Sequence, residues 1–333
     1  MASSPLFQAL RVAYNDDTPE GYWGEKTSTL NFCEEVRNSS STVLGVADPC
    51  LPPSTQDYVV SYYCAEVCNT LTNLLFLWLG FKGVHNCTSQ GHPRIFLVAY
   101  LGYVIVGLGS TAFHTSLKYP MQLIDELSMI YTTCLMVFAT FSFSKSSRFS
   151  ALLGGGLVLL AGLITVSGFP PGLLCSVDSN GTASNSTSGL NVFLVEMPTD
   201  AVQVVLRSLY VMETQLRPVL ARRNKDKADL ILNTMWIMVG TGLSVFLMGF
   251  LIWNIDNAFC SQIRQWRRQL GLPWGALLEG HAWWHLMTGV AYYYITWGIW
   301  LRRCLEGRED EYKLVWPRSL SSIPLVVKAE KSD

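Results

Sequence analysis

The sequence predicts an all-α polytopic membrane protein, built as a seven-transmembrane helix bundle. Half of its 333 residues are hydrophobic and only 15% are charged, whereas soluble domains carry about 25% charged residues. Apolar windows of roughly 20 residues, long enough to cross a hydrocarbon core about 30 Å thick, recur along the chain. The connections between these windows differ in their lysine and arginine content, as loops on the two sides of a membrane do. The net charge of −1 argues against a nucleic-acid surface.

The apolar windows follow one another from residue 58 to residue 301. Their approximate bounds are 58–81, 94–115, 121–143, 150–168, 190–212, 229–253 and 277–301. The fifth is the weakest, because four polar or helix-breaking residues interrupt it: Glu196, Pro198, Asp200 and Arg207. A six-span interpretation would put both termini on one side of the membrane. Residues 1–57 lack the apolar core of a cleavable signal peptide, so we expect internal segments to direct insertion.

Basic residues predict the orientation of the bundle. The connections after spans one, three and five, together with the tail after span seven, carry thirteen lysines and arginines near the spans, against four on the other side. Because basic loops stay in the cytosol, this predicts a lumenal or extracellular N-terminus and a cytosolic C-terminus. Glycosylation sequons begin at Asn38, Asn86, Asn180 and Asn185. Only Asn86 falls on the predicted cytosolic side.

Three histidines are predicted to meet at the lumenal end of the bundle. Span two ends near His114, and span seven begins near His281 and His285. The pair at i and i+4 projects from one helical face, a geometry that lets two imidazoles share a zinc ion. A third histidine would leave one tetrahedral position for water, as in catalytic zinc sites. The alternative is that these histidines bond neighbouring helices or lie at the membrane interface.

A serine and a carboxylate accompany the histidines. Ser110 lies one turn before His114, and Asp125 lies in the first turns of span three. Ionisable residues inside spans are costly and often functional. Both residues have an alternative, purely structural role. Ser110 can allow two helices to pack closely, and Asp125 can stabilise the N-terminus of its helix through the helix dipole.

The order of short motifs in this chain resembles that of the alkaline ceramidases, seven-span zinc amidohydrolases related to the adiponectin receptors. The matching motifs are Gly21-Tyr22-Trp23-Gly24, Cys33-Glu34-Glu35, Ala65-Glu66, Gly109-Ser110, Phe113-His114, Asp125-Glu126, Trp253-Asn254-Ile255-Asp256-Asn257 and His281-Ala282-Trp283-Trp284-His285. They extend from about residue 20 to residue 300. A receptor of the adiponectin-receptor type and a catalytically impaired paralogue are the alternatives, but the N-terminal motifs are a ceramidase feature.

The resemblance implies a reaction and the residues that perform it. His114, His281 and His285 would hold Zn²⁺, whose bound water would attack the amide carbonyl of a ceramide and release a sphingoid base and a fatty acid. Asp125 would act as the base toward that water, and Ser110 would stabilise the oxyanion. The substrate would reach the site within the bilayer of the endoplasmic reticulum or Golgi. We expect no nucleic acid and no obligate protein partner.

The resemblance also implies a calcium site and a disulfide. The calcium ligands would be Asn31, the backbone carbonyl of Phe32, Glu34, Asp57 and Glu66, and oxygen ligands suit Ca²⁺. Asn31 stands where aspartate is usual and Asp57 where asparagine is usual, which leaves the carboxylate count unchanged. A disulfide between Cys33 and Cys260 is implied as well.

We expect the chain to consist of three parts, and two stretches of it depart from the family pattern. Residues 1–57 would form a lumenal segment that contributes calcium ligands, 58–302 the catalytic bundle, and 303–333 a cytosolic tail. The loop-like stretches 36–56 and about 167–200 depart from the family's usual sequence. They are either insertions or retained introns of the gene.

Overall fold

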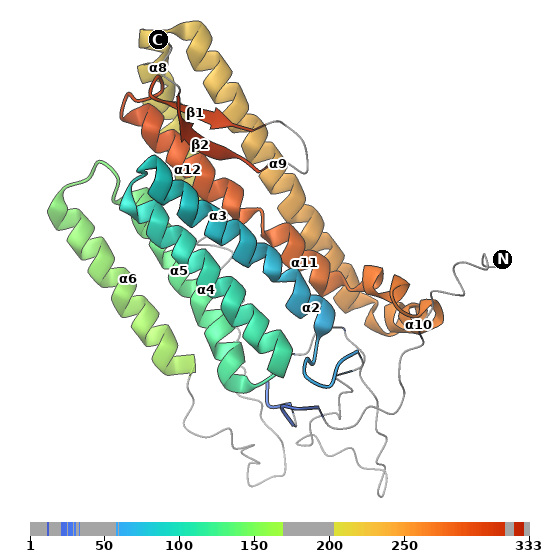
Figure 1. Cartoon of the computed structure of the whole chain (residues 1–333). Coiled ribbons are helices and arrows are strands. Elements are labelled where there is room, and N and C mark those ends of the chain that lie inside the picture. The colour runs from blue at the N-terminus through green and yellow to red at the C-terminus, as the bar shows by residue number, and fades with distance from the viewer. Residues whose placement is uncertain are drawn as a thin grey trace, which may run out of the picture.

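The computed structural model describes residues 12, 21–24, 26–28, 30, 33, 58, 60–168, 203–316 and 323–329. Its long helices lie side by side as one elongated bundle (Figure 1). Two regions of interest fall outside these residues, namely the stretch 36–56 and nearly all of 167–200. The same is true of four expected calcium ligands: Asn31, Phe32, Glu34 and Asp57.

Five helices form the first half of the bundle. They are α2 (Val67–Thr72), α3 (Leu74–Gln90), α4 (Arg94–Ser116), α5 (Tyr119–Phe141) and α6 (Ser147–Gly168). Prolines mark two of the starts, because Pro93 precedes α4 and Pro120 lies in the first turn of α5. Proline is favoured there, since the first amides of a helix have no intrahelical acceptor. The helix α6 lies at the edge of the bundle against α5 (Figure 1).

The second half begins with a continuous helical path from residue 203. Helical residues 203–211 lead into the π-helical turn Met212–Leu216 and then α8 (Arg217–Arg223). The wider turn has a local cause, because Pro218 has no N–H for the usual bond four residues back. The remaining elements are α9 (Lys225–Ala258), α10 (Cys260–Leu270), the 3₁₀ turn Trp274–Leu278, α11 (Gly280–Thr288), α12 (Ala291–Leu305), β1 (Tyr312–Val315) and β2 (Leu325–Lys328).

Four helices are long and apolar enough to cross a membrane as single elements. Among the described residues these are α4, α5, the part of α6 from Ser147 to Val166, and α9. The structure is therefore that of a helical membrane protein. Near the other three predicted spans the described residues form shorter helices, namely α2 with α3, the path from residue 203 to α8, and α11 with α12, so the count of seven stays a prediction.

The predicted start of the first span, near residue 58, is wrong. Helix α2 begins at Val67, and the path continues to Gln90 after a break at Asn73. The residues before α2 cannot be helical because their backbone amides bond elsewhere. Ala65 N–H donates to the Thr115 carbonyl at 2.9 Å and Glu66 N–H donates to the His114 carbonyl at 3.0 Å. These two bonds tie the start of α2 to the end of α4.

The main hydrophobic core lies between α3, α4, α9 and α12. Phe76 stacks on Tyr103 with ring centroids 4.8 Å apart, and Tyr100 bonds Thr296 at 2.7 Å. Gly83 is required where α3 meets α4, because a Cβ there would lie 2.3 Å from the Tyr100 ring. This core fixes α12, and thereby the preceding helix α11, against the first half of the bundle.

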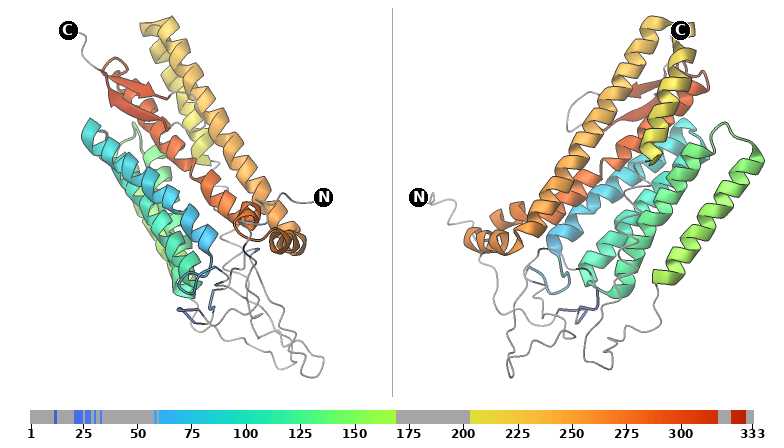
Figure 2. Two further views of the ribbon diagram at one scale, coloured as in Figure 1. Left: turned by 45° about the vertical axis from the view of Figure 1, so that its right-hand side comes forward. Right: turned by 180° about the vertical axis from the view of Figure 1, so that it is seen from behind.

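A small antiparallel pair of strands was not predicted, so the all-α expectation is incomplete. Strands β1 and β2 pair with Tyr312 opposite Lys328, and β2 packs against α3 and α12 (Figures 1 and 2). The carbonyl of the fully buried Val326 accepts from Asn86 Nδ2 at 3.1 Å and from His92 Nε2 at 2.9 Å. The Asn86 sequon is therefore a packed side chain in this fold and not an exposed glycan acceptor.

Candidate metal centre

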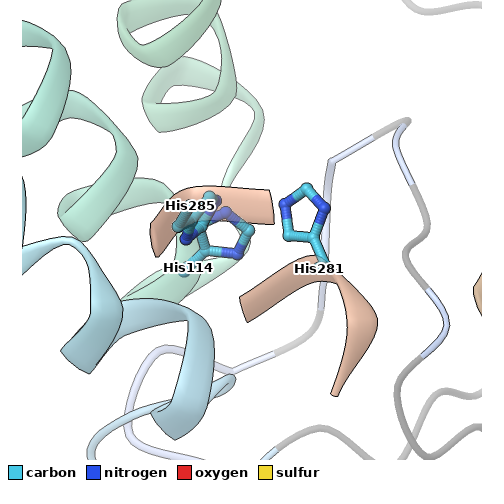
Figure 3. A group of neighbouring side chains, drawn as sticks. All are labelled: His114, His281 and His285. Carbon is cyan, nitrogen blue, oxygen red and sulfur yellow. The ribbon is translucent and has the colours of Figure 1, made fainter. Parts of the chain in front are cut away.

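Three imidazoles meet at one end of the bundle. His114 comes from the last turn of α4, and His281 and His285 come from successive turns of α11. One ring nitrogen of each histidine lies within 4.8 Å of one nitrogen of each of the others, and all three side chains are buried. Ring centroids are 5.1 Å apart for His114 and His281, and 4.6 Å apart for His281 and His285. Figure 3 shows the three labelled side chains close together, with His114 from α4 and His281 and His285 from α11.

The hydrogen bonds behind His114 leave its Nε2 available to a metal. The Nδ1 atom of His114 bonds Glu66 Oε2, and Asn69 Nδ2 donates to the same carboxylate oxygen at 3.2 Å. A carboxylate accepts the Nδ1 proton, so the lone pair of the neutral ring is on Nε2. A carboxylate behind a ligating histidine fixes the tautomer and strengthens the ligand.

The same logic applies to His285. Its Nδ1 lies 3.1 Å from the backbone carbonyl of Asn69, which can only accept, and 3.2 Å from Thr72 Oγ1. The proton is therefore on Nδ1 and the lone pair on Nε2. Buried neutral imidazoles whose other nitrogens are held by carboxylate and carbonyl acceptors suit a transition metal such as zinc.

Ser110 lies next to the histidines and is held by Asn73. Asn73 is 1% exposed and its Nδ2 donates to Ser110 Oγ at 2.9 Å and to the Asn69 carbonyl at 3.0 Å. Ser110 Oγ is thus an acceptor for the amide, which leaves the hydroxyl hydrogen to donate. Within the described part of the chain, no acceptor takes that hydrogen.

Asp125 is brought to the same place by a close contact between α4 and α5. A Cβ on Gly109 would lie 3.2 Å from the Cα of Asp125 and 3.2 Å from the carbonyl oxygen of Ile124. Only glycine permits the two backbones to approach this closely. Because Gly109 precedes Ser110, the contact sets Asp125 beside the serine-bearing turn of α4.

A buried ion cluster supports the start of α11. Arg267 of α10 is 0% exposed and pairs with Asp256 of α9 at 2.9 Å and with Glu279 at 3.0 Å. Its Nη1 also donates to the Cys33 carbonyl at 2.6 Å. Asp256 accepts the backbone N–H groups of Gly280 and His281. Arg267 therefore connects the N-terminal segment to the turn that carries His281.

The N-terminal segment is tied to this end of the bundle by further bonds. Tyr22 N–H donates to the Tyr62 carbonyl at 2.9 Å, and Thr27 N–H donates to the Leu117 carbonyl at 3.2 Å. Tyr119 N–H donates to Thr27 Oγ1 at 2.9 Å. Tyr22 of the Gly-Tyr-Trp-Gly motif thus contacts the segment before α2, and Thr27 contacts the end of α4 and the start of α5.

The disulfide implied by the resemblance is present. Cys33 is bonded to Cys260, with their Cα atoms 5.3 Å apart and a sequence separation of 227. It joins the N-terminal segment to the first residue of α10. Of the expected calcium ligands only Glu66 lies among the described residues, so the set as a whole stays a prediction.

Sequence reasoning missed the polar residues that orient the site. Glu66 was expected to bind calcium but also bonds His114, and Asn69, Thr72, Asn73 and Arg267 were given no role. One signal was available for two of them. Glu66, Asn69 and Asn73 follow a spacing of three and four residues, which puts them on one helical face. Arg267 offered no comparable signal, because the other arginines of α10 are not buried: Arg264 is half-buried and Arg268 is exposed.

Comparison with known proteins agrees with this arrangement. The family model described as Ceramidase matches residues 24–327. The chain is 31% identical to alkaline ceramidase 3 of Mus musculus over 305 residues, which cover 90% of this chain and 94% of the relative. It is 31% identical to alkaline ceramidase YPC1 of Saccharomyces cerevisiae over 317 residues, 92% of this chain and 86% of the relative. The resemblance predicted from the sequence is confirmed, and with it the expectation of an enzyme of this type.

Proposed function

The chain belongs to the ceramidase family, and we propose that it hydrolyses the amide bond of ceramides to a sphingoid base and a fatty acid. The observation that carries the proposal is the buried group formed by His114, His281 and His285. Amide hydrolysis needs an activated water, a base and a donor for the oxyanion. Candidates for each lie together at the histidine end of the bundle.

The three histidines are the proposed ligands of a catalytic zinc ion. Zinc supplies Lewis-acid activation of water and of the amide carbonyl when it is bound. The chain's part is to hold the Nδ1 atoms, so that the Nε2 atoms are aimed at one point. Glu66 does this for His114, and the Asn69 carbonyl does it for His285.

Asp125 and Ser110 are the proposed catalytic residues. Asp125 would accept a proton from the attacking water, and among the described residues no hydrogen-bond donor contacts its carboxylate. Ser110 would donate its hydroxyl hydrogen to the oxyanion that forms at the amide carbonyl, since Asn73 already fills an acceptor position on Oγ. Removing one such donor typically lowers kcat by about 10²–10³.

The proposed setting is a membrane, with seven spans. The four long apolar helices support a membrane protein. We infer that the broken paths α2 with α3 and α11 with α12, and the path from residue 203, supply the other three. The excess of basic residues at the end away from the histidines favours a lumenal site in the endoplasmic reticulum or Golgi. A ceramide would then enter the site without leaving the bilayer.

Calcium is proposed as a support for the same site. Glu66 is the one expected calcium ligand that the structure describes, and its Oε2 already serves His114 and Asn69. We assign calcium to its other carboxylate oxygen, because Ca²⁺ prefers oxygen ligands. Calcium would in this way fix the carboxylate that orients His114.

The test is hydrolysis of a ceramide with a fluorescent acyl chain by the detergent-solubilised full chain. We expect acyl release that a chelator abolishes and that zinc restores. His114→Ala should release no acyl chain, whereas Arg268→Gln, an exposed change on α10, should retain the activity. Equal release by His114→Ala and the parent would refute the metal mechanism. A parent without activity on any ceramide would refute the function.

A further inference from the structure

A small open cavity lies at the end of the bundle away from the histidines. Its volume is about 80 Å³, and it is formed by the end of α5, the turn that follows α5 and the path from residue 203 to the π-helical turn. The lining residues are Thr140, Phe143, Ser144, Lys145, Arg207, Val211 and Gln215. Asp125 and Thr140 are separated by about 22 Å along α5, at 1.5 Å per residue. The cavity is therefore distinct from the metal centre.

The polar groups of the cavity are suited to an anion. Two of its lining side chains, Lys145 and Arg207, are cations, and none is acidic. In the described ranges neither cation has an ion-pair partner. The acidic residue nearest to the lining along the chain, Glu213, is already held by Arg217 at 2.5 and 2.9 Å. Among the described residues, no carboxylate compensates the positive charge at this cavity.

Arg207 is placed to donate into the site. Its guanidinium lies over the rings of Tyr210 and Phe141, at 5.2 and 5.8 Å from their centroids. Stacking on aromatic faces leaves the N–H groups at the edge of the plane free for oxygen acceptors. The Nε atom is buried and has no hydrogen-bond partner among the described residues. An unsatisfied buried donor on a cation is costly, and an oxyanion would satisfy it.

The remaining lining residues complete such a site. Ser144, Lys145 and Gln215 are exposed, so the cavity opens to the surroundings of the bundle. Ser144 adopts a positive φ of 58°, which turns the chain sharply between α5 and α6. A volume of 80 Å³ exceeds the roughly 10–15 Å³ that one water needs, so the cavity has room for a small oxyanion.

We propose that this cavity is a binding site for a phosphate group, held by the Arg207 guanidinium and the Lys145 ammonium with help from the hydroxyl groups of Thr140 and Ser144. The group comes either from an anionic phospholipid, such as one with a phosphomonoester headgroup, or from free phosphate. Both sources present the same oxygens to Arg207. The site does not depend on whether the chain hydrolyses ceramide.

The test measures binding to the full chain in detergent through its thermal unfolding. A ligand that binds the folded state raises Tm with the logarithm of its concentration. One arm uses inorganic phosphate at constant ionic strength, and a second uses dioctanoyl phosphatidic acid against dioctanoyl phosphatidylcholine. The variants are Arg207→Gln and Lys145→Gln. The matched control is Arg222→Gln, which removes an exposed basic residue of α8 that does not line the cavity.

We expect saturable stabilisation of the parent and of Arg222→Gln. In each cavity variant the affinity should fall by about tenfold or more, because a hydrogen bond to a charged group is lost. Stabilisation by phosphate identifies free phosphate as sufficient, and stabilisation by phosphatidic acid alone identifies the lipid. No saturable stabilisation of the parent in either arm overturns the proposal. Equal affinity of Lys145→Gln and the parent also overturns the proposal. Because Lys145 is exposed, this variant tests the site even if the Arg207 variant does not fold.

Discussion

Replacing Arg267 with methionine removes the fully buried cation that pairs with two carboxylates. Asp256 and Glu279 are 3% and 10% exposed at the side chain and both pair with the arginine. Breaking a buried pair by deleting one partner costs about 3–5 kcal/mol, because the remaining charge is uncompensated. At roughly 2–4 °C of Tm per kcal/mol, we expect a fall on the order of 10 °C.

Thermal unfolding of the detergent-solubilised chain, followed by tryptophan fluorescence, measures this effect. Arg268→Gln is the matched control, because it removes an exposed arginine from the next position of α10 and leaves the pairs of Arg267 with Asp256 and Glu279 in place. Adding Asp256→Asn to Arg267→Met should restore part of the loss, since one buried charge is then removed. If Arg267→Met unfolds at the temperature of the Arg268 control, the buried ion cluster does not support the site as described.

Three further predictions concern single contacts. Glu66→Gln should weaken metal binding about 10–100-fold by removing the carboxylate behind His114; chelator competition measures this, and an unchanged affinity would contradict it. Gly280→Ala should destabilise the chain by about 1–3 kcal/mol, because the new Cβ would meet Asp256 at 2.4 Å, whereas Gly240→Ala, with open space around it, should not. Burial, and the nearby Arg303, Arg308 and Lys328, lower the pKa of His92 despite its bond to Val326. The unfolded chain then binds the proton more tightly, so stability should be full above about pH 6.5 and fall below it; equal pH profiles of the parent and His92→Gln would refute this.

The meeting of the histidines could be predicted from the sequence because it depends only on helix length and span order. His281 and His285 share a face by their spacing, and counting spans brings His114 to their level. The supporting bonds depend on details that no periodicity records. The bond between Glu66 and His114 requires that α2 begin at Val67, beside the end of α4. The span predicted from the sequence began near residue 58, so this bond was not foreseen.

The C-terminal strands and the ion cluster were beyond prediction for a similar reason. Each strand has four residues, too few for an alternating pattern to stand out from a polar tail. Their stability comes from long-range contacts, such as those of Asn86 and His92 with the Val326 carbonyl. Arg267 differs from its exposed neighbours only in facing the Cys33 carbonyl and Asp256.

The zinc content of the purified full chain tests most directly whether the three histidines form a metal centre. The parent and the Arg268→Gln control should each retain about one zinc ion per chain after dialysis. A His281→Ala, His285→Ala double variant should retain almost none, because a single imidazole cannot hold the ion. Zinc retained equally by the double variant and the parent would contradict the central claim that His114, His281 and His285 are the ligands.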